Sequence, residues 1–373
     1  MARVQRSLAL LGAALCLAAC SRPRGPIAIG LAGPFSQARG RSMQRAAQLA
    51  VAQINARGGV RGRRLLLRLA DDSAGEDAAV RVAQKLHDDP DLAAVVGHLT
   101  SGASIAAAQV YGSGPHPVVM ITPSASSPEL GGISPYVFRI CPTDVSYGAA
   151  LARFAWNALG ARRAGVIFIS NDYGRGVRKA FAADFTRLGG TVVEEDPYIP
   201  DTPSLEPYLA RMRRTGIDVL MLAAERPGAE LVLRELQVLG LHWRLLGGDA
   251  LTGIEAVSTL ADGTHIGSAY LPDRPGDRNA AFVADYARAY PGERPDHRGA
   301  GAYDAIMLLA QAITAVGADR AAVRDYLARV GSAVPPFDGV TGKIAFDSLG
   351  ETPAKSVAIG VVRSGRLVTE QSQ

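Results

Sequence analysis

The chain has 373 residues, of which 48% are hydrophobic and 20% are charged. This balance is typical of a globular protein and excludes an intrinsically disordered chain. The formal net charge of +5 comes from basic residues scattered along the sequence, and no basic stripe of the kind that binds nucleic acid is visible. The length exceeds what one hydrophobic core comfortably accommodates, so we expect two domains.

Residues 1–20 predict an export signal rather than part of the fold. Arg3 and Arg6 precede an apolar run that is too short for a permanent transmembrane helix. The run ends in Leu17-Ala18-Ala19-Cys20, which is similar to a bacterial lipobox, where the signal is cleaved before a cysteine that then carries lipid. We therefore expect Cys20 to be a lipidation site that anchors an extracytoplasmic protein to a membrane. The alternative is an ordinary signal cleaved nearby.

The remaining residue types indicate no catalytic chemistry. Cys16 leaves with the signal and Cys20 is acylated, so Cys141 stays alone and a disulfide framework is excluded. We expect Cys141 to be a small core residue. The sequence has no Gly-x-Ser-x-Gly elbow, phosphate loop or Cys/His metal spacing. Asp71-Asp72 with His98 is the best catalytic alternative, but neighbouring strand residues point to opposite faces. The sequence predicts a protein that is not an enzyme and has no metal or cofactor.

From residue 27 onward, strand and helix patterns alternate with short, glycine-rich links. In the first series we expect strands at 27–32, 65–70, 92–96, 118–121 and 137–140 and helices at 43–57 and 76–87. In the second series we expect helices at 147–159, 176–188, 205–214 and 230–239 and strands at 164–170, 191–195, 219–223, 245–247 and 266–271. Such alternation predicts parallel sheets covered by helices, and two series of similar size predict two doubly wound α/β lobes.

The C-terminal part has a different pattern. We expect helices at 278–290, 300–316 and 320–330, followed by a β-hairpin that turns at Ser364-Gly365. A tail of this kind can pack on either lobe and cross between them.

Two neighbouring strand-to-helix junctions carry small hydroxyl residues. The segment 97–104 follows one expected strand and the segment 121–130 follows another. Ligands bind at the carboxyl edge of an open parallel sheet, where helix N-termini also present unpaired N–H groups. Hydroxyls of Ser101, Ser124 and Ser126 at this edge suit a small carboxylate. The alternative is that these serines only cap helices.

Several short motifs occur in a characteristic order behind the lipobox. They are Gly33-Pro34-Phe35, residues 52–59, Asp71-Asp72, Thr122-Pro123-Ser124-Ala125-Ser126, Asn171-Asp172-Tyr173-Gly174 and Ala302-Tyr303-Asp304-Ala305. With them, residues 26–370 resemble the type I periplasmic binding proteins, in the leucine/isoleucine/valine-binding branch that serves ABC importers. The resemblance implies two Rossmann-like lobes joined by a three-strand hinge. It assigns residues 24–141 and 273–342 to the N-terminal lobe and residues 142–272 and 343–373 to the C-terminal lobe.

The resemblance also implies a ligand site between the lobes. Ser101 and Ser126 would bind the α-carboxylate of an amino acid, and Ser124 falls where a backbone carbonyl meets the ammonium group. Tyr173 would close over the ligand from the second lobe, and Asp249 would pair with the ammonium.

This chain departs from the branch at two pocket positions. Arg39 and Glu225 align where the branched-chain binders carry tyrosines that touch the ligand side chain or the pocket wall. Charged residues there would suit a polar ligand or a small amide. The alternative is that the alignment slips and both charges face solvent. Thr100 occupies a cysteine position of the family, so the family's first-lobe disulfide is not expected.

These features predict a lipid-anchored, extracytoplasmic, monomeric solute-binding protein that delivers an amino acid or a similar small polar solute to an ABC permease. No nucleic-acid partner is expected. The alternative is a ligand-sensing or regulatory lipoprotein of the same fold that is not coupled to a permease.

Overall fold

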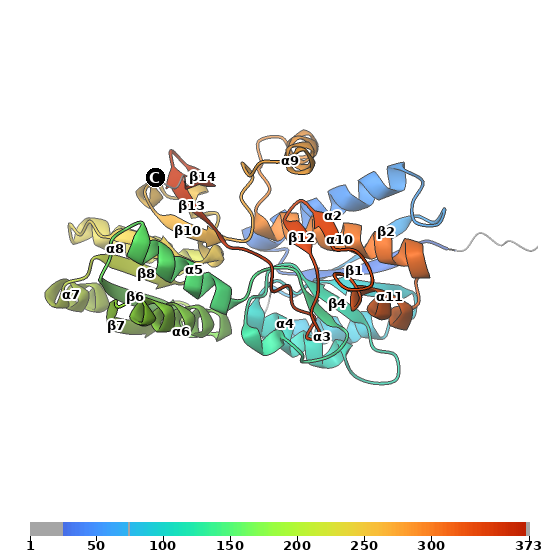
Figure 1. Cartoon of the computed structure of the whole chain (residues 1–373), viewed down its shortest axis with the longest axis horizontal. Helices are drawn as coiled ribbons and strands as arrows, with labels where there is room; N and C mark the ends of the chain where they lie inside the picture. The colour runs from blue at the N-terminus through green and yellow to red at the C-terminus, as the bar shows by residue number, and fades with distance from the viewer. Residues whose placement is uncertain (1–24, 74, 371–373) are drawn as a thin grey trace, which may run out of the picture.

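A computed structural model describes residues 25–73 and 75–370 of the protein. It contains two α/β lobes that lie side by side (Figure 1), each built around its own sheet and hydrophobic core. The predicted fold class is therefore confirmed. The expected export signal and Cys20 lie outside the described residues.

The first lobe contains a parallel sheet whose strand order is β2-β1-β3-β4-β5. Its strands are β1 (Ile27–Gly33), β2 (Leu65–Asp71), β3 (Leu92–Val96), β4 (Val119–Thr122) and β5 (Val137–Arg139). Every residue of β1, β3, β4 and β5 is buried, because helices cover both faces of the sheet. One face carries α2 (Ala38–Ala56), α10 (His297–Val316) and α11 (Arg320–Leu327), and the other carries α3 (Glu76–His87) and α4 (Ser101–Tyr111).

Smaller elements complete this lobe. The helix α9 (Asp277–Ala289) packs on α2 through Phe282 and Tyr286. The strands β11 (Phe337–Gly339) and β12 (Gly342–Ile344) form a hairpin after α11. The short 3-10 helix η1 (Pro128–Leu130) lies between β4 and β5. The hairpin was not predicted.

The helix α10 is long and apolar enough to cross a membrane by length and composition alone. However, 67% of its apolar stretch is buried inside the protein. Its apolar residues contact the first sheet together with α2, which is how a core helix behaves.

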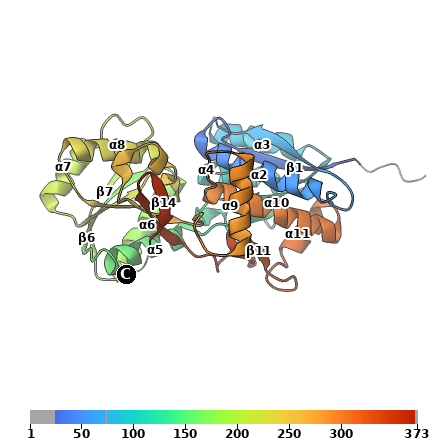
Figure 2. The ribbon, with the colours of Figure 1, turned by 90° about the horizontal axis from the view of Figure 1, so that it is seen from above.

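The second lobe contains a sheet with the order β14-β13-β10-β9-β8-β6-β7. Its strands are β6 (Arg163–Ile169), β7 (Thr191–Tyr198), β8 (Val219–Ala223), β9 (Arg244–Gly247), β10 (His265–Ser268), β13 (Ala358–Arg363) and β14 (Arg366–Thr369). The hairpin β13–β14 joins antiparallel to β10, and the other strands pair in parallel. The helices α5 (Asp144–Asn157) and α6 (Asp172–Arg187) pack together on one face, and α7 (Glu206–Thr215) and α8 (Arg226–Val238) lie on the other (Figure 2). Short 3-10 helices η2 (Asp249–Leu251), η3 (Ile254–Ala256) and η4 (Thr259–Ala261) follow β9.

Within the described residues, the chain passes between the lobes three times. The crossings follow β5, follow β10 and precede β13. Phe346 packs in the core of the first lobe and Glu351 pairs with Arg139 of β5. The third crossing therefore lies after residue 351, whereas the expected division placed it after residue 342.

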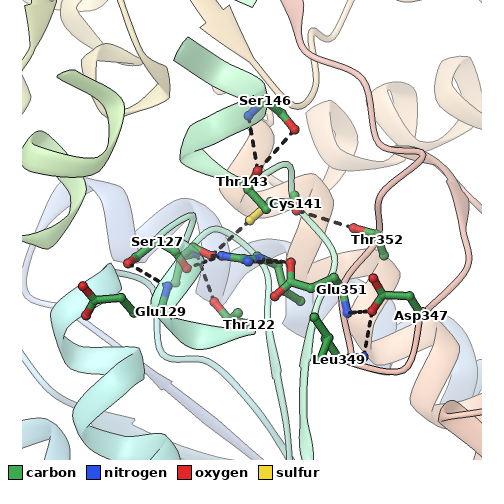
Figure 3. A network of polar contacts seen from close by, with 12 residues as sticks. Thr122, Ser127, Glu129, Cys141, Thr143, Ser146, Asp347, Leu349, Glu351 and Thr352 are labelled. Carbon is green, nitrogen blue, oxygen red and sulfur yellow. Dashed lines mark hydrogen bonds and ion pairs between the residues drawn. The ribbon is translucent and has the colours of Figure 1, made fainter. Parts of the chain in front are cut away.

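Polar contacts hold the first and third crossings together (Figure 3). The buried Arg139 donates from Nε to Glu351 at 2.7 Å and from Nη1 to the carbonyl oxygen of Ser127 at 2.6 Å. Thr352 donates to the carbonyl oxygen of Cys141 at 3.5 Å, and Asp347 accepts from the backbone N–H of Glu351 at 3.0 Å. The hinge segments are therefore fixed to each other beside the first lobe.

Candidate ligand-binding cleft between the lobes

The parallel strands of both sheets present their carboxyl ends to one cleft between the lobes. The cleft has a volume of about 510 Å³, within the range of small-molecule sites. Its wall includes all six predicted site residues, namely Ser101, Ser124, Ser126, Tyr173, Glu225 and Asp249. Arg39, Asn171 and Arg298 also line it.

The first lobe supplies the hydroxyl groups. Ser101 is the first residue of α4, and its Oγ accepts from the backbone N–H of Ser127 at 3.2 Å. Ser124 and Ser126 follow β4 and are buried. None of these three serines is the N-cap of a described helix, since that position before α4 belongs to Thr100. Their hydroxyls and the first N–H groups of α4 thus form a wall rich in donors.

The second lobe supplies a buried carboxylate. Asp249 begins η2 directly after β9 and is only 3% exposed. Its Oδ2 lies 3.3 Å from Nε2 of His297, while its Oδ1 has no hydrogen-bond partner among the described residues. An unpaired buried carboxylate oxygen is costly, so this atom is suited to receive a cation.

Tyrosines surround this carboxylate. Tyr173 lies in the first turn of α6, which Asn171 caps by accepting from Gly174 N–H at 2.9 Å. The Tyr173 hydroxyl accepts from the backbone N–H of Ala250 at 3.3 Å. Burial, followed by the negative charge of Asp249, raises the pKa of Tyr147 and of Tyr173 well above the ordinary value. Both phenols therefore stay protonated and neutral at physiological pH.

The start of α10 reaches across the cleft, which was not predicted. His297, the first residue of α10, is buried against Asp249 of the other lobe. The Arg298 guanidinium donates to the carbonyl oxygen of Asp249 at 3.3 Å and to the Asp296 carboxylate at 3.0 Å. The only sequence signal nearby is the Ala302-Tyr303-Asp304-Ala305 motif, which carries no information about what the preceding turn contacts.

Arg39 and Glu225 line the cleft and bind each other. Nη1 of Arg39, in the first turn of α2, lies 3.0 Å from Oε2 of Glu225. Their side chains are 27% and 25% exposed. Both side chains thus face the cleft and each other, and the ion pair joins the two lobes.

Three residues with potentially catalytic side chains, Asp72, His98 and Cys141, have structural contacts instead. Asp72 accepts from the buried His98 at 2.5 Å, and the other ring nitrogen of His98 lies 3.2 Å from the Tyr111 hydroxyl. Cys141 is buried and its thiol donates to the carbonyl oxygen of Ala125 at 3.4 Å. Burial raises the pKa of Cys141, which opposes formation of a nucleophilic thiolate.

Two α/β lobes that face each other across a polar, ligand-sized cleft define a bilobal solute-binding protein. The chain belongs to the periplasmic binding protein family, whose sequence profile matches residues 26–366. The resemblance seen in the motifs is confirmed.

Individual relatives agree with this membership. The Leu/Ile/Val-binding protein BraC3 of Rhizobium johnstonii is 29% identical over 355 residues, which is 92% of this chain and 94% of that protein. An ABC transporter substrate-binding protein from Desulfitobacterium hafniense, solved in complex with Leu, has 30% identity and a TM-score of 0.81 over 92% of this chain and 100% of that chain. A leucine-binding protein LivK from Thermotoga maritima has 27% identity and a TM-score of 0.83 over 92% of this chain and 98% of that chain. These relatives are binding proteins, which confirms the prediction that the chain is not an enzyme.

Proposed function

We propose that this protein is the solute-binding component of an ABC importer and that it holds an α-amino acid in the cleft between its lobes. One observation carries the proposal: a donor-rich wall of serines on the first lobe faces a buried, incompletely paired carboxylate on the second.

This arrangement matches the charges of a zwitterion. The hydroxyls of Ser101 and Ser126, with the N-terminus of α4, would receive the α-carboxylate. Oδ1 of Asp249 would receive the ammonium group. Each buried charge of the ligand then has a partner of opposite sign, which is the condition for burying charges at acceptable cost.

The relatives support the same class of ligand and partner. The Desulfitobacterium hafniense protein is described as an ABC transporter substrate-binding protein and holds Leu. Transfer of that role to this chain implies a permease as its partner and an extracytoplasmic location. A screen by thermal shift would identify the amino acid, because a ligand at 100 times its Kd adds about 2.7 kcal/mol of stability.

Two substitutions test the site once a ligand is found. Ser126→Ala removes one hydrogen bond to a charged group, so we expect affinity to fall about 10- to 100-fold. Asp249→Asn keeps the shape but removes the charge facing the ammonium, and we expect a loss at least as large. Calorimetry measures both.

The exposed Ser113→Ala serves as a control that should bind normally. A ligand with a carboxylate but no amine would be weakened by Ser126→Ala alone. Normal affinity in both site variants would contradict the proposed pocket.

We also propose that Cys20 carries a lipid anchor. Cys20→Ser should abolish lipidation, detected by metabolic labelling with a fatty acid, and should leave ligand affinity unchanged. Lipid label retained in the Cys20→Ser protein would contradict this assignment.

A further inference from the structure

The Arg39–Glu225 ion pair is supported from both lobes. Arg39 donates from Nε to Gln37 at 2.8 Å, and Glu225 accepts from the amide of Asn171 at 3.4 Å. Glu225 is also the N-cap residue of α8, where the helix dipole favours a negative charge. A donor and an acceptor are thus held next to each other in fixed positions.

The pair lies where two cavities meet. Arg39, Glu225 and Arg298 line the main cleft and also line a second cavity of about 150 Å³. The side chain of a ligand that entered between Arg39 and Glu225 would therefore find space behind them.

The chemistry of this wall selects among side chains. An apolar side chain would take water away from the ion pair and return no hydrogen bond. A ligand carboxylate would be repelled by the negative charge of Glu225, and a ligand ammonium would be repelled by the positive charge of Arg39. A carboxamide avoids these conflicts, because its oxygen accepts from a guanidinium while its NH₂ group donates to a carboxylate.

We propose that Arg39 and Glu225 form a subsite that selects an amino acid whose side chain ends in a carboxamide. The carboxamide takes a place between the two charged groups, so that each keeps a partner, while Gln37 and Asn171 hold them in position. This inference rests on the proposed function, since it requires an amino acid whose α-groups bind Ser126 and Asp249.

The first test compares ligands on the unmodified protein. Calorimetry with L-glutamine, L-asparagine, L-leucine, L-glutamate and L-lysine should show one of the two amides binding at least tenfold more tightly than the other three. Leucine, glutamate or lysine as the best ligand would overturn the inference.

The second test measures how the charge of each residue affects the ratio of glutamate to lysine affinity. Glu225→Gln removes the negative charge, so the ratio of glutamate to lysine affinity should rise at least tenfold. Arg39→Gln removes the positive charge, and the same ratio should fall by a similar factor. If the pair merely latched the lobes together, both variants would weaken every ligand by one common factor, which would overturn the inference.

A matched ion pair outside the cleft provides the control. Arg178 and Glu195 lie 2.9 Å apart with side chains 32% and 34% exposed, close to the values of Arg39 and Glu225. Arg178→Gln and Glu195→Gln should leave the ratio unchanged.

The outcomes also separate the two proposals. If leucine binds best while Ser126→Ala and Asp249→Asn still weaken it, the inference is overturned and the proposed function stands. If no amino acid binds the unmodified protein, both are overturned.

Discussion

Asp144, the first residue of α5, is a buried acid that sequence reasoning did not single out. Its backbone N–H donates to the carbonyl oxygen of Ser126 at 2.8 Å. Neither carboxyl oxygen has a hydrogen-bond partner in the described chain. Burial raises its pKa from 3.8 to about 7; the nearby Ser126 hydroxyl opposes this rise, and the charge of Asp249 adds a smaller contribution to it. The group therefore titrates near neutrality in the folded protein.

This raised pKa predicts how stability changes with pH. Between pH 4 and 7 the folded state holds a proton that the unfolded state has lost, so the free energy of unfolding should fall as pH rises through this window. One pKa unit corresponds to about 1.4 kcal/mol, and we expect a contribution of roughly 2–4 kcal/mol. Asp144→Asn is neutral at every pH and should remove most of this loss. Urea unfolding at pH 5 and pH 8 measures the free energy of unfolding of the unmodified protein and of Asp144→Asn. An equal pH dependence in the two proteins would contradict the raised pKa of Asp144.

Among single residues, type and position placed the three serines at the carboxyl edge of the first sheet, whereas Asp249 came only from the resemblance to the family; the structure brings all four to the wall of one cleft. His297 and Arg298 were missed because their partner, Asp249, is far away in sequence and in the other lobe. No local pattern encodes such a contact. Whether Arg39 and Glu225 face the cleft or solvent could also not be decided from an alignment alone.

Among the elements, strands and helices were mostly identified correctly, and their ends were less accurate. The helix expected at 176–188 begins at Asp172, and the one expected at 230–239 begins at Arg226. Apolar periodicity marks where a helix starts to pack, whereas the cap at Asn171 and Pro227 near the start of α8 mark where the helix begins. The strand β7 continues past Pro197 because it is an edge strand, where a missing N–H is tolerated.

The hinge segments depend on the Arg139–Glu351 pair. Glu351→Gln leaves the nearly fully buried Arg139 without its counter-ion, so we expect the free energy of unfolding to fall by about 2–4 kcal/mol. Chemical unfolding measures the change. In the control, Glu370→Gln breaks an ion pair with the exposed Arg363 and should cost less than about 1 kcal/mol. Equal losses in the two variants would show that the Arg139 pair has no special role.

For the whole molecule, two lobes and their α/β class followed from the repeated strand–helix pattern. The position of the third crossing could not be predicted from this pattern. The segment between β12 and β13 has no regular structure, and its attachment depends on distant partners such as Arg139. The β11–β12 hairpin was missed for a related reason. Its strands have three residues each, too few to show a clear alternating pattern.

The contacts across the cleft predict that the described arrangement is the closed one. Arg39–Glu225 and His297–Asp249 each require the lobes to approach closely. A ligand that touches both lobes favours this state over an open one. We expect small-angle scattering of the ligand-saturated protein to match this structure and the radius of gyration to be larger without ligand. A bound ligand that leaves the scattering unchanged would contradict hinge closure.

The interleaved path of the chain has a consequence for biosynthesis. The helices α10 and α11 cover one face of the first sheet, yet they follow the entire α-helical part of the second lobe in the sequence. As the chain emerges from the ribosome or the export channel, the first sheet appears with that face covered only by α2. The hydrophobic core of the first lobe stays incomplete until the chain has emerged as far as Phe346. A nascent chain stalled before α10 would expose the part of this apolar face that α10 and α11 cover, so the protein needs shielding from aggregation until its last fifth arrives.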